Sequence, residues 1–335
     1  MKAAVHSRYG PPAVVRIAEV EKPSVGDHDV LVRVHATTVN RTDCAYRAAR
    51  PFFMRALTGL TRPRRAVLGT EYAGVVDAVG SGVTSFSVGD RVFGYNEGAF
   101  GTHAEYLSVP QDGAVAAMPG GVTFEESAPG TEGAHYAMSF VRTARVRAGQ
   151  DVLVYGATGA IGSAAVQLLK HHGATVTAVC GKAQLELVKG LGADRVVDYT
   201  AQDFTRDEQR YDAVFDAVGK STFGRCRRLL KPGGVYLSSE LGPGWQNVIL
   251  PLVTPLFRGR RVRFPLPQQN QQVVRQIRDL IEAGEFKPVV DRRYPLERIV
   301  DAYQYVETGH KIGNVVITVV PQTQSSSSSP SSTER

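Results

Sequence analysis

One stretch, residues 151–182, constrains what this chain can fold into more than any other. It opens with a strand-length apolar run at 152–155 that stops where the sequence GATGAIG begins. Apolar residues then recur at the spacing of a helix with one buried face until Gly173, a residue typical of helix ends. Because a second apolar run follows at 175–180, the stretch predicts a strand, a helix and a second strand with a glycine-rich turn after the first.

The glycines of this turn are suited to a dinucleotide. Without Cβ atoms, Gly156, Gly159 and Gly162 let the turn tighten, the backbone approach a pyrophosphate and the helix pack closely on the strand. The helix N-terminus then offers free N–H groups and the positive end of its dipole to the phosphates. The spacing is GxxGxxG rather than GxGxxG, so a tight turn in an unrelated α/β protein is the alternative. The predicted cofactor contacts in the turn are Gly156, Thr158, Gly159, Ala160, Ile161 and Gly162.

The end of the second strand bears on which dinucleotide binds. NAD-binding units usually carry Asp or Glu about 20 residues beyond the turn, where the carboxylate holds the ribose 2′-OH. Here the strand ends in Cys180, Gly181 and Lys182, without a carboxylate. A cation at this place attracts a 2′-phosphate, which favours NADPH, while a solvated surface lysine is the alternative interpretation.

Length and charge narrow the class of protein. A chain of 335 residues can hold two domains with separate cores, and 43% hydrophobic with 21% charged residues is ordinary for a globular protein. The formal charge of +7 allows attraction to anions, including a phosphorylated cofactor. Because the basic residues are scattered in short groups, we expect solvated faces and no nucleic-acid binding.

Cysteine use and hydropathy bear on location. The three cysteines, Cys44, Cys180 and Cys226, are far apart and odd in number, which argues against a disulfide framework and against a CxxC-type metal site. The N-terminus has no apolar signal-peptide core, and no run approaches the roughly 18 apolar residues of a membrane span. We expect a cytoplasmic protein without membrane contact.

The rest of the chain divides into successive parts. Residues 1–122 are rich in short strands and turn signals, which predicts a small barrel-like domain. Strands and helices alternate over 123–265, from a Thr-x-x-Glu capping box onward, which predicts a parallel sheet covered by helices on both faces. The segment 266–320 has two amphipathic helices and a strand that returns to the first domain. The polar tail 321–335 is predicted to be disordered.

Several motifs in a fixed order resemble the medium-chain dehydrogenase/reductase superfamily. They are GTEYAGVVDAVGSGV, VGDRVFGY, YGATGAIG, LGADRVVDY, YDAVFDAVG and LLKPGG, and the resemblance covers nearly all of the chain up to about Val320. It implies an α/β protein in which a Rossmann domain, a doubly wound parallel sheet at 123–265, is joined to a GroES-like β-barrel catalytic domain at 1–122 plus 266–320. We expect such a chain to form a homodimer.

The zinc alcohol dehydrogenases of that superfamily hold a catalytic zinc on Cys, His and Cys. The resemblance aligns these three positions with Asn40 in VNRTD, Thr70 in GTE and a position near Pro129. Neither Asn nor Thr supplies the soft or imidazole ligand that zinc prefers, and the four-cysteine structural lobe is missing. No metal site is therefore predicted.

What remains resembles the zinc-free quinone oxidoreductase branch, whose members use NADPH to reduce quinones or the C=C bond of enones and enals. In that branch an NxxD pattern lines the nicotinamide pocket, matched here by Asn40 and Asp43. A basic residue after the second strand and a tyrosine after the third bind the 2′-phosphate, matched by Lys182 and Tyr199. The resemblance therefore implies NADPH and a small quinone or enone substrate.

Two positions depart from that branch. A tyrosine expected near Ala45 is shifted to Tyr46, and the threonine often found beside the nicotinamide is Gly133. Thr131 or His135 could substitute for that threonine. Further cofactor contacts are implied at strand ends, at the domain junction and in the return segment, namely Thr131, Cys180, Gly181, Val218, Gly219, Ser238, Ser239 and Asn314.

Without a metal, hydride transfer depends on holding the nicotinamide about 3–3.5 Å from an electron-poor carbon, with a proton donor nearby. The predicted catalytic residues are Asn40, Asp43 and Tyr46. We expect the amide N–H of Asn40 to orient the substrate or the ribose, and Tyr46 or water to supply the proton. The alternatives are a turn-forming Asn40, a packing role for Tyr46 and an Asp43 that anchors its own loop, and His135 is more often structural than catalytic.

Three functions are compatible with these residues. The first, which the sequence favours, is an NADPH-dependent reductase of quinones or α,β-unsaturated carbonyl compounds. The second is a conventional alcohol dehydrogenase of the same fold, which bound zinc would support. The third is a non-enzymatic NADPH-binding protein, which tight cofactor binding without turnover would support. Fold alone does not decide among them.

Overall fold

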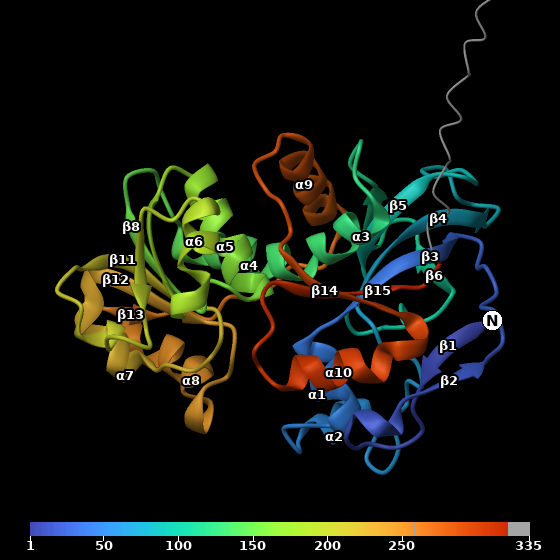
Figure 1. The fold of residues 1–335 in the computed structure, drawn as a ribbon, viewed down its shortest axis with the longest axis horizontal. Coiled ribbons are helices and arrows are strands. Elements are labelled where there is room, and N and C mark those ends of the chain that lie inside the picture. The colour runs from blue at the N-terminus through green and yellow to red at the C-terminus, as the bar shows by residue number, and fades with distance from the viewer. Residues whose placement is uncertain (257–258, 321–335) are drawn as a thin grey trace, which may run out of the picture.

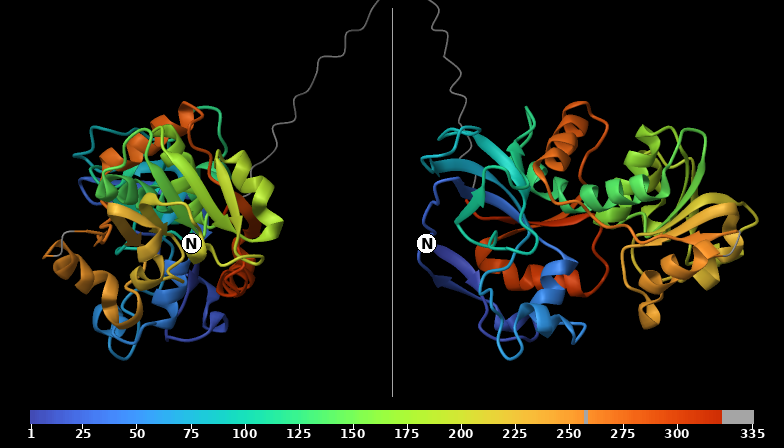
Figure 2. Two further views of the ribbon diagram at one scale, coloured as in Figure 1. Left: turned by 90° about the vertical axis from the view of Figure 1, so that its left-hand side faces the viewer. Right: turned by 180° about the vertical axis from the view of Figure 1, so that it is seen from behind.

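The computed structural model describes residues 1–256 and 259–320, which form two lobes with a sheet in each (Figure 1). The tail 321–335, predicted to be disordered, lies outside the described residues. One lobe contains the glycine-rich turn. The other combines the N-terminal strands with the C-terminal return segment, as the right-hand view in Figure 2 shows.

The lobe with the glycine-rich turn has a six-stranded sheet whose neighbouring strands are all parallel. Its order is β10-β9-β8-β11-β12-β13. The first strand, β8, is central, β9 and β10 lie on one side of it, and β11, β12 and β13 follow on the other side. This is the doubly wound order of nucleotide-binding sheets, and it confirms the predicted fold class. The strands are β8 Asp151–Tyr155, β9 Thr175–Cys180, β10 Arg195–Asp198, β11 Tyr211–Asp216, β12 Leu230–Ser238 and β13 Arg261–Val262.

Helices cover both faces of this sheet (Figure 1). Val152 of β8 packs into one core with Phe140 of α4 and Leu168 of α5, whereas the next residue, Leu153, packs on the opposite face with Leu229. Because both faces are buried, the strands are continuous apolar runs rather than alternating ones. The helices of this lobe are α4 Glu132–Ala144, α5 Ala160–His171, α6 Leu185–Gly190, α7 Phe223–Cys226 and α8 Gln246–Val253.

The second lobe is built on a seven-stranded sheet in the order β14-β15-β3-β4-β5-β7, with β6 paired to β3. The C-terminal strand β15 pairs antiparallel with β3, with Val315 opposite Val39, so the return segment rejoins the first domain as predicted. The strands are β3 Asp29–Val39, β4 Glu71–Val79, β5 Arg91–Tyr95, β6 Tyr106–Pro110, β7 Val115–Ala117, β14 Val290–Pro295 and β15 Asn314–Thr318. A separate two-stranded sheet joins β1 Lys2–Val5 to β2 Arg16–Glu19.

Several helices of this lobe lie where nearby residues in the sequence predict them. The predicted capping box opens α3 Phe124–Ser127, where Thr123 Oγ1 accepts the N–H of Glu126 at 3.2 Å and the Glu126 carboxylate accepts the N–H of Thr123 at 2.9 Å. The two predicted amphipathic helices are α9 Gln271–Glu282 and, after a 3-10 turn, α10 Ile299–Glu307. A short helix, α2 Met54–Thr58, lies in the basic stretch before β4.

Some elements gave no signal in the sequence. The edge strand β14 is VDRRYP, whose side chains are mostly polar, so it shows no apolar alternation. The helix α8 contains Pro251, which argues against a helix interior. The helix α1 Arg41–Ala48 is short and polar, and it depends on a capping box formed by Asn40 and Asp43.

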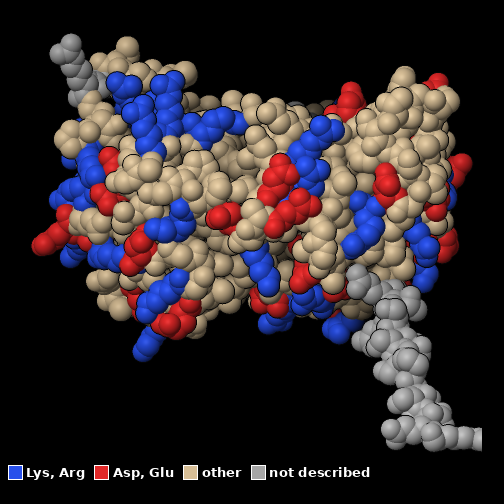
Figure 3. Space-filling model, turned by 90° about the horizontal axis from the view of Figure 1, so that it is seen from above, with Lys and Arg blue, Asp and Glu red and all other residues tan. Residues whose placement is uncertain are grey.

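Charges on the surface are mixed. On the face shown in Figure 3, acidic side chains lie among the basic ones, and a group of basic side chains gathers toward the end that holds the six-stranded sheet. Within residues 1–256 and 259–320, none of the helices combines the length and the apolar character that crossing a membrane requires.

The helices α4 and α5 cross closely at Gly133. A Cβ atom on Gly133 would lie 2.7 Å from the carbonyl oxygen of Ala160, the first residue of α5, and 3.3 Å from its Cβ. A backbone oxygen cannot yield as a flexible side chain can. The glycine that replaces the threonine of the quinone oxidoreductase branch is therefore required by this helix crossing.

We expect Gly133→Ala to lower the free energy of unfolding by about 1–3 kcal/mol, the usual cost of overpacking. Gly190→Ala is the matched control, because Gly190 lies in α6 and a Cβ there meets nothing within 4 Å. That change should raise stability by up to about 1 kcal/mol through helix propensity. Urea unfolding followed by circular dichroism measures both, and equal effects would contradict the close crossing.

Candidate functional site

A cleft of about 180 Å³ lies where the two lobes meet, at the carboxyl ends of β8, β11 and β12. This is where the strand order of a doubly wound sheet reverses, the usual ligand position in such folds. One wall comes from the glycine-rich turn and the loops after β11 and β12, and the other from the starts of α1 and α4 and the loop after α10. The residues that line it include Asn40, Thr42, Glu132, Gly156, Thr158, Gly159, Ala160, Ile161, Val218, Ser239 and Lys311.

The three glycines of the turn serve different purposes. Gly156 has φ +81°, and a Cβ on it would lie 2.8 Å from Val218 Cβ. A Cβ on Gly162 would lie 2.1 Å from the Gly156 carbonyl oxygen, so the fold itself requires both glycines. A Cβ on Gly159 would meet only that same oxygen, at 3.7 Å. Gly159 therefore leaves open space that no protein atom fills.

This open space suits a phosphate group. The N-cap of α5 is Gly159, and no side chain caps the helix, so the N–H groups of its first turn are available to an anion. A β-carbon at the cap would occupy the place where an oxygen must approach the backbone. The residues present therefore fit the pyrophosphate of a dinucleotide.

A buried carboxylate shapes the loop after β11. The side chain of Asp216 accepts the N–H of Gly219 at 2.8 Å, the N–H of Ser221 at 2.9 Å and the hydroxyl of Tyr236 at 3.0 Å. These bonds fold the loop so that Val218 lines the cleft beside the turn. Sequence reasoning missed Asp216, although a carboxylate that ends a buried apolar strand was the available signal.

The predicted 2′-phosphate residues lie beyond the ends of β9 and β10. Lys182 and Tyr199 are exposed, and the backbone N–H of Tyr199 donates to the carbonyl of Cys180 at 3.1 Å. The Tyr199 ring lies near Gly181, since a Cβ there would be 3.5 Å from the Tyr199 hydroxyl. The Cys180 side chain is buried in the core, so only its backbone is available to a ligand.

The first two zinc-ligand positions are bonded to each other. The Asn40 side chain caps α1 by accepting the N–H of Asp43 at 2.9 Å, and its Nδ2 donates to Thr70 Oγ1 at 2.6 Å. The third position, Pro129, lies in a helical turn and has no donor side chain. Within the described part of the chain, no group of three or more His, Cys, Asp or Glu side chains could hold a metal ion. The residues at these positions do not fit zinc.

Asp43 anchors the start of α1. It is fully buried, and its carboxylate oxygens accept the backbone N–H groups of Asn40 and Gly69, each at 3.0 Å. Burial raises its pKa to about 8, although these two N–H groups lower it in part. The contacts are those of the loop-anchoring alternative, since Asp43 does not line the cleft.

Tyr46 lies outside the cleft. Its ring packs against Phe100 with centroids 4.4 Å apart, and it lines a different cavity of about 200 Å³ together with Leu68 and Arg64. Burial raises the pKa of the Tyr46 hydroxyl. Its role as proton donor stays a prediction, but the structure shows it in packing contact.

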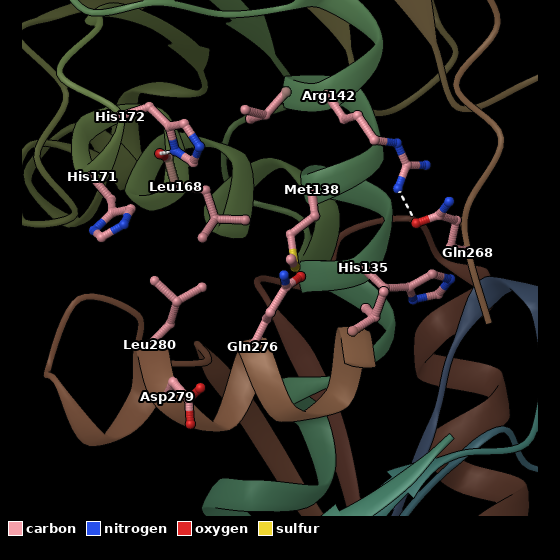
Figure 4. A pocket seen from close by; sticks show the side chains of 12 residues that line it. His135, Met138, Arg142, Leu168, His171, His172, Gln268, Gln276, Asp279 and Leu280 are labelled. Carbon is pink, nitrogen blue, oxygen red and sulfur yellow. Dashed lines mark hydrogen bonds between the residues drawn. The ribbon is translucent and has the colours of Figure 1, made fainter. Parts of the chain in front are cut away.

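The two residues weighed as substitutes for the missing threonine are held by other groups. Thr131 is buried, and its N–H and hydroxyl both donate to Glu71 Oε1, at 3.1 and 3.0 Å. His135 stacks on Tyr95 with centroids 4.5 Å apart, and its Nε2 lies 3.6 Å from Glu97 Oε2. His135 lines a second cavity, of about 400 Å³, between α4, α5 and α9, where Figure 4 places its ring near Gln268. Neither residue lines the cleft.

Of the remaining predicted cofactor contacts, some line the cleft and others do not. Ser239 lines the cleft, and the neighbouring Ser238 is buried, with its Oγ accepting the N–H of Glu240 at 3.2 Å. Gly219 has φ +67° and supports the loop beside Val218. The Asn314 amide donates to the carbonyl of Val289 at 3.1 Å, beside β15, and does not line the cleft.

Thr42, Glu132 and Lys311 are among the cleft residues that the sequence analysis missed. Thr42 follows the Asn40 cap, Glu132 opens α4, and Lys311 lies in the loop before β15. The Thr42 hydroxyl donates to Glu132 Oε1 at 2.9 Å, and burial lowers the pKa of the Lys311 amine. None of the three was assigned a role, although Thr42 lies within VNRTD, because these residues come together only where the two lobes meet.

Known proteins share both lobes. A family model described as "Alcohol dehydrogenase GroES-like domain" matches residues 26–120, and one described as "Zinc-binding dehydrogenase" matches residues 191–317. The chain is 31% identical over 336 residues to the 2-methylene-furan-3-one reductase of Solanum lycopersicum, with 96% of this chain and 80% of that protein covered. It is 32% identical over 340 residues to an NADPH-dependent alkenal/one oxidoreductase of Arabidopsis thaliana, with the same shares covered.

The solved structures agree with this likeness. The quinone oxidoreductase of Coxiella burnetii superposes with a TM-score of 0.86 at 26% identity, covering 96% of this chain and 99% of that one. Both lobes and their connection are therefore shared with that protein.

The different purposes of the glycines can be tested separately. We expect Gly159→Ala to weaken dinucleotide binding at least about tenfold, because the methyl group fills the space for the phosphate, while the unfolding free energy changes by only a few tenths of a kcal/mol. Gly162→Ala is the control, since its Cβ meets a backbone oxygen and should destabilise the protein itself. Fluorescence titration with cofactor and urea unfolding measure the two effects. Normal cofactor affinity in Gly159→Ala would contradict the assignment.

Proposed function

Because this chain belongs to the medium-chain dehydrogenase/reductase superfamily, we propose that it is an NADPH-dependent reductase of quinones or of the C=C bond of α,β-unsaturated carbonyl compounds. The observation that carries the proposal is the cleft, where a dinucleotide turn faces Asn40, whose amide donates to the buried Thr70 at the two positions that align with zinc ligands. Relatives named as enone, alkenal and quinone reductases support the same class of substrate.

The choice of NADPH over NADH is supported by charge. Lys182 is an exposed cation just after β9, at the place where NAD-binding units carry a carboxylate. The ring of Tyr199 lies close to the same backbone, at Gly181. A 2′-phosphate placed there gains a cation and a hydroxyl, whereas NADH gains neither contact. One relative is also named as NADPH-dependent.

Metal independence is supported by the Asn40–Thr70 bond. Two side chains that hydrogen-bond directly at 2.6 Å leave no room for an ion between them, and neither offers a thiolate or an imidazole. The alcohol dehydrogenase alternative depends on a Lewis acid at this point. It is therefore not favoured.

The residues that line the cleft hold the cofactor and the substrate in position. A bound nicotinamide cofactor supplies a hydride. Gly159 gives the pyrophosphate access to the start of α5, and the loop held by Asp216 sets the wall beside it. The Asn40 amide uses one N–H for Thr70, which leaves its second N–H for a substrate oxygen or ribose in the cleft. Orientation of this kind can supply several kcal/mol of the barrier reduction.

Other expectations stay predictions. The homodimer and the cytoplasmic location rest on the sequence alone. The non-enzymatic alternative requires that the cleft bind cofactor without turnover, and the following measurement decides that point.

The activity is tested by following NADPH oxidation with quinones, enals and enones, with NADH measured alongside and bound metal determined. We expect turnover with at least one of these acceptor classes, a clear preference for NADPH, and no stoichiometric zinc. Cofactor binding without turnover of any acceptor would favour the non-enzymatic protein. Stoichiometric zinc that is needed for activity would favour the alcohol dehydrogenase.

Cofactor preference is tested with Lys182→Ala. We expect NADPH to bind about tenfold more weakly, a loss of about 1.4 kcal/mol, while NADH binding is nearly unchanged, because only NADPH carries the 2′-phosphate. Lys189→Ala is the matched control, since Lys189 is an exposed lysine on α6 that pairs with Glu186 at 2.8 Å. An equal loss for both cofactors in Lys182→Ala would refute the assignment.

A further inference from the structure

Glu132 places a carboxyl group in the wall of the cleft. It is the first residue of α4, and it lines the same cavity as the glycine-rich turn and Asn40. Its side chain accepts one hydrogen bond, from the hydroxyl of Thr42 at 2.9 Å, and Thr42 is itself a lining residue. The carboxyl is therefore held where the cofactor turn and the proposed substrate wall meet.

A second carboxyl, Glu71, lies directly behind it. The backbone N–H of Glu132 donates to Glu71 Oε1 at 2.6 Å, and the N–H and hydroxyl of Thr131 donate to the same oxygen. The hydroxyl of Thr38 donates to Glu71 Oε2 at 2.6 Å. Four donors stabilise a carboxylate, whereas the Glu132 carboxyl receives only the Thr42 bond. Of the two neighbouring carboxyls, Glu71 is the one suited to be the anion and Glu132 the one suited to keep a proton.

The surroundings of Glu132 favour the protonated form. Burial raises its pKa well above the usual range, and Glu71, Glu97 and Asp43 raise it further by repulsion. The Thr42 bond acts in the opposite sense, as does the attraction between Glu132 and the cation of Lys311. Burial and the neighbouring carboxyl groups outweigh one hydroxyl and a buried amine whose own charge is disfavoured, so the pKa of Glu132 lies well above its usual range.

We propose that Glu132 is the proton donor in the reduction, an inference that rests on the proposed function. Hydride from the nicotinamide forms a C–H bond at the β-carbon of the enone, and the C=C electrons move toward the carbonyl to give an enolate. The O–H bond of Glu132 breaks as its proton forms a C–H bond at the α-carbon of the enolate, and the C=O double bond re-forms, so the enone is reduced and the cofactor oxidised. The carboxylate then regains a proton from water.

The donor expected from the sequence is less well placed. Tyr46 lines the separate cavity beside Phe100, and burial raises the pKa of its hydroxyl, which makes it a weaker acid. It does not line the cleft that holds the glycine-rich turn. Glu132 combines a position in that cleft with a retained proton.

The proton itself can be observed without turnover. The infrared spectrum of the cofactor-free protein contains the carbonyl stretch of a protonated carboxyl group, and the difference between wild type and Glu132→Gln isolates the contribution of Glu132. We expect this signal at neutral pH and its loss as the pH rises. The free energy of unfolding gives a second test. The Glu132 carboxyl ionises at a lower pH in the unfolded chain than in the folded one. The free energy of unfolding of the wild type should therefore fall as the pH rises from about 4.3 through the folded pKa of Glu132. The fall should be smaller in Glu132→Gln.

Turnover supplies the kinetic test. We expect Glu132→Gln to lower kcat at saturating NADPH at least about 100-fold, the lower range for loss of a general acid, with the KM for NADPH changed less than about threefold. The wild-type rate should fall as the pH rises through the Glu132 pKa, and this alkaline decline should disappear in the variant. Glu132→Asp should recover part of the rate. Glu125→Gln is the matched control, because Glu125 is a partly buried glutamate in α3 that pairs with Arg293 outside the cleft.

Either of two results overturns the proposal: Glu132→Gln turns over within about threefold of wild type at saturating cofactor, or Tyr46→Phe, and not Glu132→Gln, removes the alkaline decline. A wild-type protein that turns over none of the acceptors would instead refute the proposed function. In that case the infrared difference still decides whether Glu132 holds a proton.

Discussion

The buried carboxylate of Glu71 is the interaction on which the relation between the two lobes depends. It stands at the start of β4, in the second lobe, and it accepts hydrogen bonds from Thr38 of β3 and from the residues that open α4. The same helix, α4, packs against α5 of the nucleotide-binding lobe. Burial raises the pKa of Glu71, and the hydrogen bonds from Thr38, Glu132 and Thr131 lower it in part by stabilising the anion. The hydrogen bonds from Thr131 and Glu132 to Glu71 thus fix the start of α4 against the second lobe.

The hydrogen bonds between Glu71 and the start of α4 determine the shape of the cleft. With the start of α4 held by Glu71, Gly133 is brought against Ala160 at the first turn of α5, and Glu132 is turned toward the glycine-rich turn. The start of α1, in the same wall as the start of α4, is also fixed, because Asp43 ties it to Gly69. A site that works by placement needs walls of this kind, since a shift of about 1 Å at a reacting atom can cost a factor of about 100 in rate.

The sequence predicted what is encoded locally. The turn 156–162, the doubly wound sheet and the returning strand β15 all follow from glycine spacing and apolar periodicity within short windows. The bonds from Glu71 to Thr131 and Glu132 join residues about sixty positions apart, and the surrounding residues carry no periodic signal for them. Asn40 was found through its motif, but the sequence alone did not show that its amide bonds Thr70. Side-chain networks of this kind depend on the fold, so they become visible only once the lobes are placed.

The proposed zinc-independent reaction has to obtain an acid from another source. In the zinc enzymes the metal stabilises the charge that develops on the substrate oxygen. Here the Asn40 amide donates to Thr70, so these two positions offer hydrogen-bond geometry and no metal ion ligands. The negative charge that follows hydride transfer then has to be neutralised by a proton. Glu132, whose pKa is raised by burial and by neighbouring carboxyl groups, lies in the same wall and is the proposed source of that proton.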